Sequence, residues 1–305
     1  MTLQERNSQD IPPGRLLMGS DDGFYPEEGP TREIDVAGGK WDVAPVTVAQ
    51  WRDFISDSGY TTDAEKIGGS VVFVGTAGPV ALNDWSQWWG MVEGAYWDAP
   101  QGPAAPLPER FAEHPVVHVS YRDALEYCQW AGAELPDEAE WEWAARGGLV
   151  GATYSWGEEA NKGNHLHANS WQGDFPYDNR GAGGWRGTSP VGTFPANGYG
   201  LVDMTGNVWE WTRTTWESAP GVGCACSGTT LEEGLMKTIK GGSHLCSPQY
   251  CLRYRPAARS PQEVTTSTSH IGFRCIRPHS EAESSKPRTI DVDLSNLSTH
   301  MSRDA

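Results

Sequence analysis

Glycine and proline interrupt this chain throughout, and they limit what it can fold into. The 305 residues include 36 Gly and 21 Pro, together with 15 Trp. Gly and Pro end helices and begin turns, so we expect few long helices. Trp has a large surface to bury, and a chain rich in both Trp and loops favours aromatic clusters that hold irregular backbone together. We therefore expect long ordered loops, which commonly carry function or bind ions.

Composition and charge exclude several classes of protein. Hydrophobic residues make up 38% of the chain and charged residues 21%, which is typical of a globular domain. The net charge of −17 repels phosphate backbones, so we expect no nucleic-acid partner. No stretch approaches the roughly 18 apolar residues of a membrane helix, and we expect no membrane partner. The first residues lack a basic and then apolar signal region, so we expect a cytoplasmic location.

Apolar residues at helical spacing predict three helices, over residues 47–59, 121–130 and 136–146. In the first, Val48, Trp51 and Phe54 fall on one face. In the third, Asp137 is followed three residues later by Glu140, which is typical of a capping box. The pattern elsewhere is too irregular to predict further helices.

Strands are predicted to be short and few, over residues 15–18, 32–36, 237–241 and 272–276. Residues 76–110 contain Gly, Pro and aromatic residues without a clear period, and we interpret them as an ordered loop. Residues 1–10 are polar and predicted to be a flexible N-terminus. Residues 279–305 are polar and lack aromatic residues, which predicts a disordered tail.

Cysteine usage points to chemistry rather than to a disulfide framework. The chain has six cysteines, at positions 128, 224, 226, 246, 251 and 275. Because disulfides are rare in a reducing cytosol, paired cysteines are better interpreted as metal ligands or redox groups. We expect Cys128 and Cys275 to be small buried core residues, and we assign no role to Cys224 and Cys226.

Cys246 and Cys251 form the most informative pair. Their spacing of five is neither the two-residue gap of a zinc knuckle nor a helical pair. A turn at Ser247 and Pro248 would let the two sulfurs meet. Three arginines follow, at positions 253, 255 and 259, and nearby cations lower the pKa of a thiol and favour the thiolate.

Two thiolates without a His or carboxylate partner suit a soft ion of low coordination number. Cu(I) fits this description, whereas zinc would require four ligands. Spacing alone leaves three alternatives open: a Cu(I) site, a redox dithiol and a pair with no function.

The residues around this pair resemble one family. The run Gly241–Ser260 and the segment Ile271–Cys275 look like the C-terminal signature of formylglycine-generating enzymes. Other family-like segments occur in order at Ile11–Ser20, Pro45–Thr47, Leu135–Gly148, Asn169–Pro176 and Gly198–Trp211. The resemblance implies one catalytic domain over residues 11–278. It also implies an irregular, C-type-lectin-like α+β fold with few helices and small twisted antiparallel sheets.

The resemblance implies a specific oxidation. Cys246 and Cys251 would bind Cu(I), and a substrate cysteine in a Cys-x-Pro-x-Arg sulfatase motif would add its sulfur. O2 would be reduced at the metal, a hydrogen would leave the substrate Cβ, and hydrolysis of the thioaldehyde would release sulfide and leave formylglycine. Ser243 would lie beside the oxygen site. Trp209 and Tyr250 would line the pocket, with core packing as the alternative.

Calcium is also implied by the resemblance. One site would take two carboxylates and two backbone carbonyls, from Asp203, Gly206, Val208 and Glu210, and such oxygen donors suit Ca²⁺. The alternative role of Asp203 and Glu210 is a turn cap and a solvated charge. A second site would use Asn169 and the carbonyls of Ser170 and Trp185. Its acidic ligand falls at Gly183 in this chain, and Asp178 is a candidate substitute.

Two segments depart from the family pattern near the expected peptide site. Ser247-Pro248-Gln249 replaces the usual His-Arg-Ser, and Pro261–Ser267 replaces Asn-Thr-Pro-Asp-Ser-Ser. These changes could alter substrate recognition, but neither removes a copper ligand.

Other functions receive less support from the sequence. A non-catalytic, calcium-stabilised binding module could use the same fold, since fold alone does not decide function. The presence of both Cys246 and Cys251 argues against this alternative. A non-haem iron sulfoxide synthase would need a His-x3-His-x-Glu pattern, and a serine hydrolase a Gly-x-Ser-x-Gly elbow; neither pattern occurs here.

Overall fold

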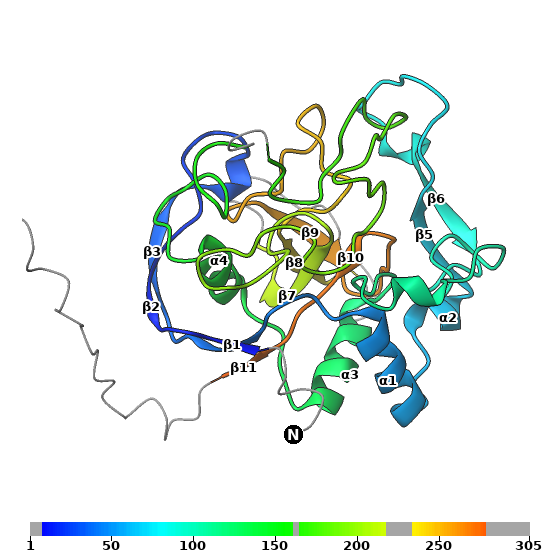
Figure 1. Ribbon diagram of the computed structural model, residues 1–305, viewed down its shortest axis with the longest axis horizontal. Helices are drawn as coiled ribbons and strands as arrows, with labels where there is room; N and C mark the ends of the chain where they lie inside the picture. The colour runs from blue at the N-terminus through cyan, green and yellow to red at the C-terminus, as the bar shows by residue number, and fades with distance from the viewer. Residues whose placement is uncertain (1–7, 161–164, 218–233, 279–305) are drawn as a thin grey trace, which may run out of the picture.

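Helices are few and short in this protein, as the density of Gly and Pro predicts. The computed structural model describes residues 8–160, 165–217 and 234–278 (Figure 1). Its α-helices are α1 (Val48–Ser58), α2 (Asp63–Ile67), α3 (Tyr121–Ala131) and α4 (Glu138–Arg146). Single 3-10 turns form η2 (Pro26–Glu28), η3 (Trp85–Gln87) and η4 (Glu109–Phe111). Within the described ranges, no helix is long and apolar enough to cross a membrane.

The three predicted helices are confirmed, and local signals explain their bounds. Thr47, Ser120 and Asp137 are the N-caps of α1, α3 and α4, and each forms a capping box with the residue three positions later. Each helix ends at a glycine in the left-handed conformation, at positions 59, 132 and 147. These signals lie within one turn of the helix ends and are therefore readable from the sequence.

In the described ranges, the strands form four small sheets. They are β1 (Ser8–Ile11), β2 (Gly14–Met18), β3 (Arg32–Val36), β4 (Gly39–Asp42), β5 (Gly69–Phe73), β6 (Trp89–Glu93), β7 (Trp209–Thr215), β8 (Met236–Lys240), β9 (Arg259–Glu263), β10 (Ile271–Gly272) and β11 (Ile276–Arg277). The strand orders are β1-β4-β11, β10-β7-β8-β9, β2-β3 and β5-β6. The α+β class with few helices and small sheets is confirmed. The expectation of purely antiparallel sheets is wrong at one pair, because β10 and β7 run parallel.

Several predictions on the order of the chain need correction. Residues 8–10, assigned to a flexible N-terminus, belong to β1, which pairs with β4. The predicted loop 76–110 contains β6, which pairs with β5 in a hairpin. The predicted strand 272–276 is replaced by two short strands, β10 and β11, that pair with different sheets. The predicted tail and the pair Cys224 and Cys226 lie outside the described residues.

The four-stranded sheet lies at the centre of the molecule, with α4 and the β2–β3 hairpin on one side and β5–β6 on the other (Figure 1). Its strands are backed by buried charged pairs rather than by apolar residues alone. Lys240 at the end of β8 lies 3.1 Å from Glu142 of α4, and Arg274 lies 2.7 Å from Glu210 of β7. The long β8–β9 connection leaves this fixed centre and carries Cys246 and Cys251.

Candidate active site

The turn between Cys246 and Cys251 brings the two sulfurs together. The backbone N–H groups of Tyr250 and Cys251 both donate to the Ser247 carbonyl, at 3.0 and 2.7 Å. The two Sγ atoms are 3.2 Å apart, whereas a disulfide bond is about 2.05 Å long. Both cysteines are free thiols. The turn predicted at Ser247 and Pro248 is therefore present, and the pair is reduced.

The two thiols differ in acidity because they share a hydrogen bond. Burial alone would raise the pKa of Cys246, but the hydrogen bond with Cys251, the Ser243 N–H and the Arg253 guanidinium together lower it. The same hydrogen bond to Cys246, together with burial, raises the pKa of Cys251 well above its ordinary value. Of the two thiols, Cys246 is therefore the more acidic and is the first to lose its proton.

The cysteines open into a pocket of about 630 Å³. The predicted residues Ser243, Trp209 and Tyr250 all line it with them, so the structure brings the five predicted catalytic residues together. Trp209 is 5% exposed and packs in the main hydrophobic core, so it both lines the pocket and contributes to the core. Tyr250 is 40% exposed and stands at the mouth.

Aromatic rings on separate segments make the wall of this pocket. Tyr250 stacks on Phe175 with ring centroids 4.8 Å apart and an interplanar angle of 4°. Trp88 contacts both rings edge-on. Sequence reasoning did not single out Phe175 or Trp88, or Tyr25, which also lines the pocket. These residues come from three distant segments without a shared motif.

Of the three arginines after Cys251, one faces the thiols. The Arg253 guanidinium lies 3.9 Å from the Tyr25 ring centroid and 2.6 Å from Glu27. Arg255 and Arg259 instead form ion pairs with buried glutamates, Glu28 and Glu138, both at 2.7 Å. The expectation that all three cations favour the thiolate therefore holds for Arg253 and is wrong for Arg255 and Arg259.

The first predicted calcium site contains a carboxylate that is already compensated. Glu210 is fully buried and accepts hydrogen bonds from Trp141 at 2.7 Å and from two nitrogens of Arg274 at 2.7 and 2.8 Å. Asp203 accepts a hydrogen bond from Gly192 N–H at 2.7 Å, and burial raises its pKa to about 6. Among the described residues no salt bridge reaches Asp203, in contrast to Glu210, and calcium binding here stays a prediction.

The second predicted calcium site has an oxygen that fits a cation. The side-chain carbonyl oxygen of Asn169 is buried and has no hydrogen-bond partner among the described residues. The Asn169 amide nitrogen donates to the Gly187 carbonyl at 3.0 Å, which places the side chain beside the loop that carries Trp185. Gly183 offers no side-chain ligand, and Asp178 is exposed. A buried amide oxygen without a partner is one of the oxygen donors that Ca²⁺ takes as ligands.

Clusters of three or more His, Cys, Asp or Glu side chains suited to a metal do not occur in the described part of the chain. His165 and His167 alternate in the sequence, and His167 stacks on Trp156 with ring centroids 5.2 Å apart. Metal chemistry from side chains alone therefore centres on the dithiol. The fold and this site define an α+β protein built around a reduced cysteine pair in an open aromatic pocket.

Comparisons with known proteins agree with this class. A family model described as "Sulfatase-modifying factor enzyme 1-like domain" matches residues 3–279. The formylglycine-generating enzyme of Mycobacterium tuberculosis is 50% identical, over 88% of this chain and 96% of that protein. A protein of Bos taurus described as "Inactive C-alpha-formylglycine-generating enzyme 2" is 38% identical, over 89% of this chain and 88% of that protein.

A solved structure shares the fold. The structure of PvdO from Pseudomonas aeruginosa superposes with a TM-score of 0.62 at 24% identity, covering 89% of this chain and 94% of that one. The chain belongs to the formylglycine-generating enzyme family. Active enzymes of this family are O2-dependent oxidoreductases, and this chain is one of them.

Proposed function

We propose that this protein converts a cysteine of a target polypeptide to Cα-formylglycine with O2, using Cu(I) held by Cys246 and Cys251. The observation that carries the proposal is the reduced pair, with sulfurs 3.2 Å apart, at the wall of an open pocket. Two sulfur donors without a third side-chain ligand suit Cu(I), and they leave room for the sulfur of a substrate cysteine. When bound, Cu(I) would supply the activation of O2 and would hold the substrate thiolate.

The residues of the chain prepare the pocket for that chemistry. The lowered pKa of Cys246 makes its thiolate easier to form, and Cys251 would release its proton on metal binding, since metal ligands must be deprotonated. The positive charge of Arg253 lowers the energy of the thiolates that result.

Ser243 and the aromatic wall would act on the substrate side. The Ser243 hydroxyl oxygen accepts from Leu245 N–H at 3.2 Å, and among the described residues its own O–H has no acceptor. It can therefore donate into the pocket. Trp209 and the stacked rings of Tyr250 and Phe175 would keep water from the reacting sulfur and Cβ until hydrolysis.

The electron balance requires a reductant. Oxidation of the substrate thiol to an aldehyde, with release of hydrogen sulfide, removes two electrons from the substrate, whereas reduction of O2 to the oxidation level of water takes four. A thiol reductant would supply the other two. One substrate thiol, one O2 and two reductant thiols would then give one aldehyde, one hydrogen sulfide, one water and one reductant disulfide. We therefore expect turnover to require added thiol.

We further propose that the target motif is the sulfatase Cys-x-Pro-x-Arg. Both departures from the family pattern lie at the pocket. The Gln249 side chain accepts from Phe175 N–H at 3.1 Å and so supports the aromatic wall. Gln262 and Thr266, from the altered 261–267 segment, line the pocket. If this protein prefers different substrate residues next to the motif, we expect these side chains to determine that preference.

We also propose a structural Ca²⁺ at Asn169, with the carbonyls of Ser170 and Trp185. The unpartnered buried oxygen of Asn169 supports it. Backbone and amide oxygens alone would bind Ca²⁺ weakly, so we expect a role in loop stability rather than in catalysis. The cytoplasmic location expected from the sequence stays a prediction.

A peptide mass assay tests the oxidation. The protein is loaded with Cu(I) and incubated in air, with a thiol reductant, with the peptide Leu-Cys-Thr-Pro-Ser-Arg. We expect a product in which one sulfur and two hydrogens have been exchanged for one oxygen, and which reacts with an aldehyde probe. Cys251→Ala should give none. An unchanged peptide despite bound copper would overturn the proposed Cu(I)-dependent conversion of this motif.

A further inference from the structure

A second pocket lies back to back with the cysteine pocket and has a volume of about 790 Å³. The two share a wall made of Phe73, at the end of β5, and Leu245, between the cysteines and β8. Along this wall Ser243 and Cys246 face the cysteine pocket, whereas His244 faces the second one. A polypeptide that crosses the rim of the shared wall would therefore contact both pockets.

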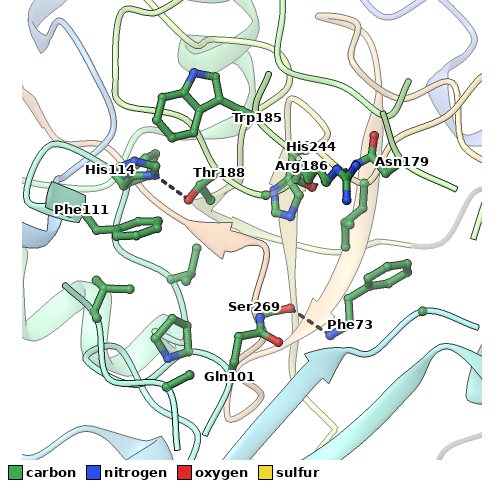
Figure 2. A pocket seen from close by; sticks show the side chains of 18 of the residues that line it. Phe73, Gln101, Phe111, His114, Asn179, Trp185, Arg186, Thr188, His244 and Ser269 are labelled. Atoms are coloured by element: carbon green, nitrogen blue, oxygen red, sulfur yellow. Dashed lines mark hydrogen bonds between the residues drawn. The ribbon is translucent and has the colours of Figure 1, made fainter. Parts of the chain in front are cut away.

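The second pocket is lined by rings and by a few polar groups. Figure 2 shows its side chains facing one another across the cavity, with Trp185, Thr188 and His244 on one side and Phe73, Gln101 and Ser269 on the other. Six aromatic side chains line it, Phe73, Trp97, Phe111, Trp171, Tyr177 and Trp185. A pocket of this size and composition suits a large apolar side chain with polar groups beside it.

The charged residues that line this pocket are opposite in sign to the net charge of the chain. The chain has 40 acidic and 23 basic residues, yet the described residues that line the pocket include Arg110 and Arg186 and no Asp or Glu. Both arginines are exposed, and no salt bridge among the described residues uses either of them. Burial lowers the pKa of His114 and His244 to about 4, so the imidazoles are neutral and the positive charge is that of the arginines.

We propose that the second pocket binds the substrate polypeptide beside its modified motif, taking an aromatic or large aliphatic side chain between the rings and an adjacent acidic residue against Arg110 and Arg186. The occupant follows from two observations, the wall shared with the cysteine pocket and the charge complementarity. The proposal rests on the proposed function in naming the occupant as substrate. It deepens that function by assigning a specificity site outside the Cys-x-Pro-x-Arg motif.

The test is a binding measurement that does not depend on turnover. Fluorescent peptides carry Leu-Ser-Thr-Pro-Ser-Arg, in which Ser replaces the reactive cysteine, and a flexible spacer of about four residues, which spans at most about 14 Å. Beyond the spacer, one peptide ends in Phe-Asp-Asp and its partner in Phe-Lys-Lys, in versions with the flank before or after the motif. Anisotropy titration gives Kd for the wild type, for Arg186→Glu and for Arg32→Glu. The last is the control, because Arg32 on β3 is exposed, lies outside both pockets and changes the net charge equally.

The proposal predicts that, in one of the two flank positions, the wild type binds the acidic peptide at least about threefold more tightly than the basic one, a ratio within the range that exposed charge pairs give. Arg186→Glu should abolish or reverse this ratio, whereas Arg32→Glu should retain it. Equal binding in both flank positions would overturn the proposal, and so would an acidic preference that survives Arg186→Glu. Conversion of the cysteine-containing core peptide is measured separately, so a failure of the proposed oxidation is visible on its own.

Discussion

The loop of Cys246 and Cys251 and the segment of Asp203 and Glu210 each carry a pair of candidate metal ligands, but the two pairs are satisfied differently. The thiols are satisfied by each other, through one shared proton that a metal can replace. Glu210 is satisfied by Arg274 and Trp141, at distances of 2.7 to 2.8 Å. A thiol whose partner is a hydrogen bond can exchange that proton for a metal ion. A carboxylate in a buried ion pair with arginine instead stabilises the fold.

The largest expected effect comes from removing a thiol. Cys246→Ala or Cys251→Ala should lower kcat/KM for peptide conversion by more than about a hundredfold, because loss of groups that merely support a metal ligand already costs 10- to 100-fold. Copper binding should be lost with it. Cys128→Ala is the matched control, since Cys128 is a buried thiol outside the pocket. An equal loss of activity and copper binding in Cys128→Ala would contradict the assignment of Cys246 and Cys251 as the copper ligands.

Breaking the buried ion pair of Glu210 and Arg274 should instead lower the free energy of unfolding. Glu210→Gln leaves the Arg274 guanidinium buried without its counter-charge, and we expect a loss of about 3–5 kcal/mol in the free energy of unfolding. Glu33→Gln, in the exposed pair with Arg15, should cost less than about 1 kcal/mol. Urea denaturation measures both. If chelation of calcium alone destabilised the wild type as much as Glu210→Gln does, Glu210 would be a metal ligand and the comparison would fail.

The buried imidazole of His118, which is hydrogen-bonded to its neighbours, should make the free energy of unfolding depend on pH. His118 is fully buried between Ser70 and the Pro100 carbonyl, at 2.8 and 2.9 Å, and burial lowers its pKa from 6.5 to about 4. The unfolded chain takes up a proton in this window that the folded chain does not. The stabilisation present above pH 6.5 is therefore lost as pH falls towards 4, by an amount on the order of 3 kcal/mol.

The measurement is the free energy of unfolding as a function of pH in the wild type and in His118→Asn. Asn tolerates the left-handed backbone that His118 adopts, with φ of 60°. The variant should show a shallower slope between pH 4 and 6.5. An identical slope would mean that His118 does not carry this dependence.

A smaller effect is expected from calcium. Millimolar Ca²⁺ should raise the unfolding temperature of the wild type by a few degrees, because an ion that binds only the folded state stabilises it. Mg²⁺ should not substitute, since it keeps its water ligands. Asn169→Ala should remove the shift, and a shift that persists in this variant would place the ion elsewhere.

The two regions also differ in what their sequence could reveal. The helices were predictable because caps such as Asp137 with Glu140 act within one turn. The cysteine pair was predictable because a five-residue turn closes on itself. Proximity in sequence predicts that Arg255 and Arg259 act on the thiols, but they pair with Glu28 and Glu138, which are more than a hundred residues away.

The remaining parts of the site could not be predicted because long-range packing assembles them. Phe175 and Trp88 meet Tyr250 only in the folded chain. The β6 strand was missed because its Trp-Gly-Met pattern lacks alternation, and pairing with β5 defines it. The pairing of Glu210 with Arg274 depends in the same way on the parallel contact of β7 and β10, which the expectation of antiparallel sheets did not include.

The most direct test of the copper assignment is a titration in which metal content and peptide conversion are measured on the same samples. Metal-free protein receives increasing Cu(I) in the presence of thiol reductant and O2. We predict that conversion rises in proportion to bound copper and stops rising at about one ion per chain, with neither binding nor conversion in Cys251→Ala. Full conversion by the chelator-treated, copper-free protein would contradict this assignment.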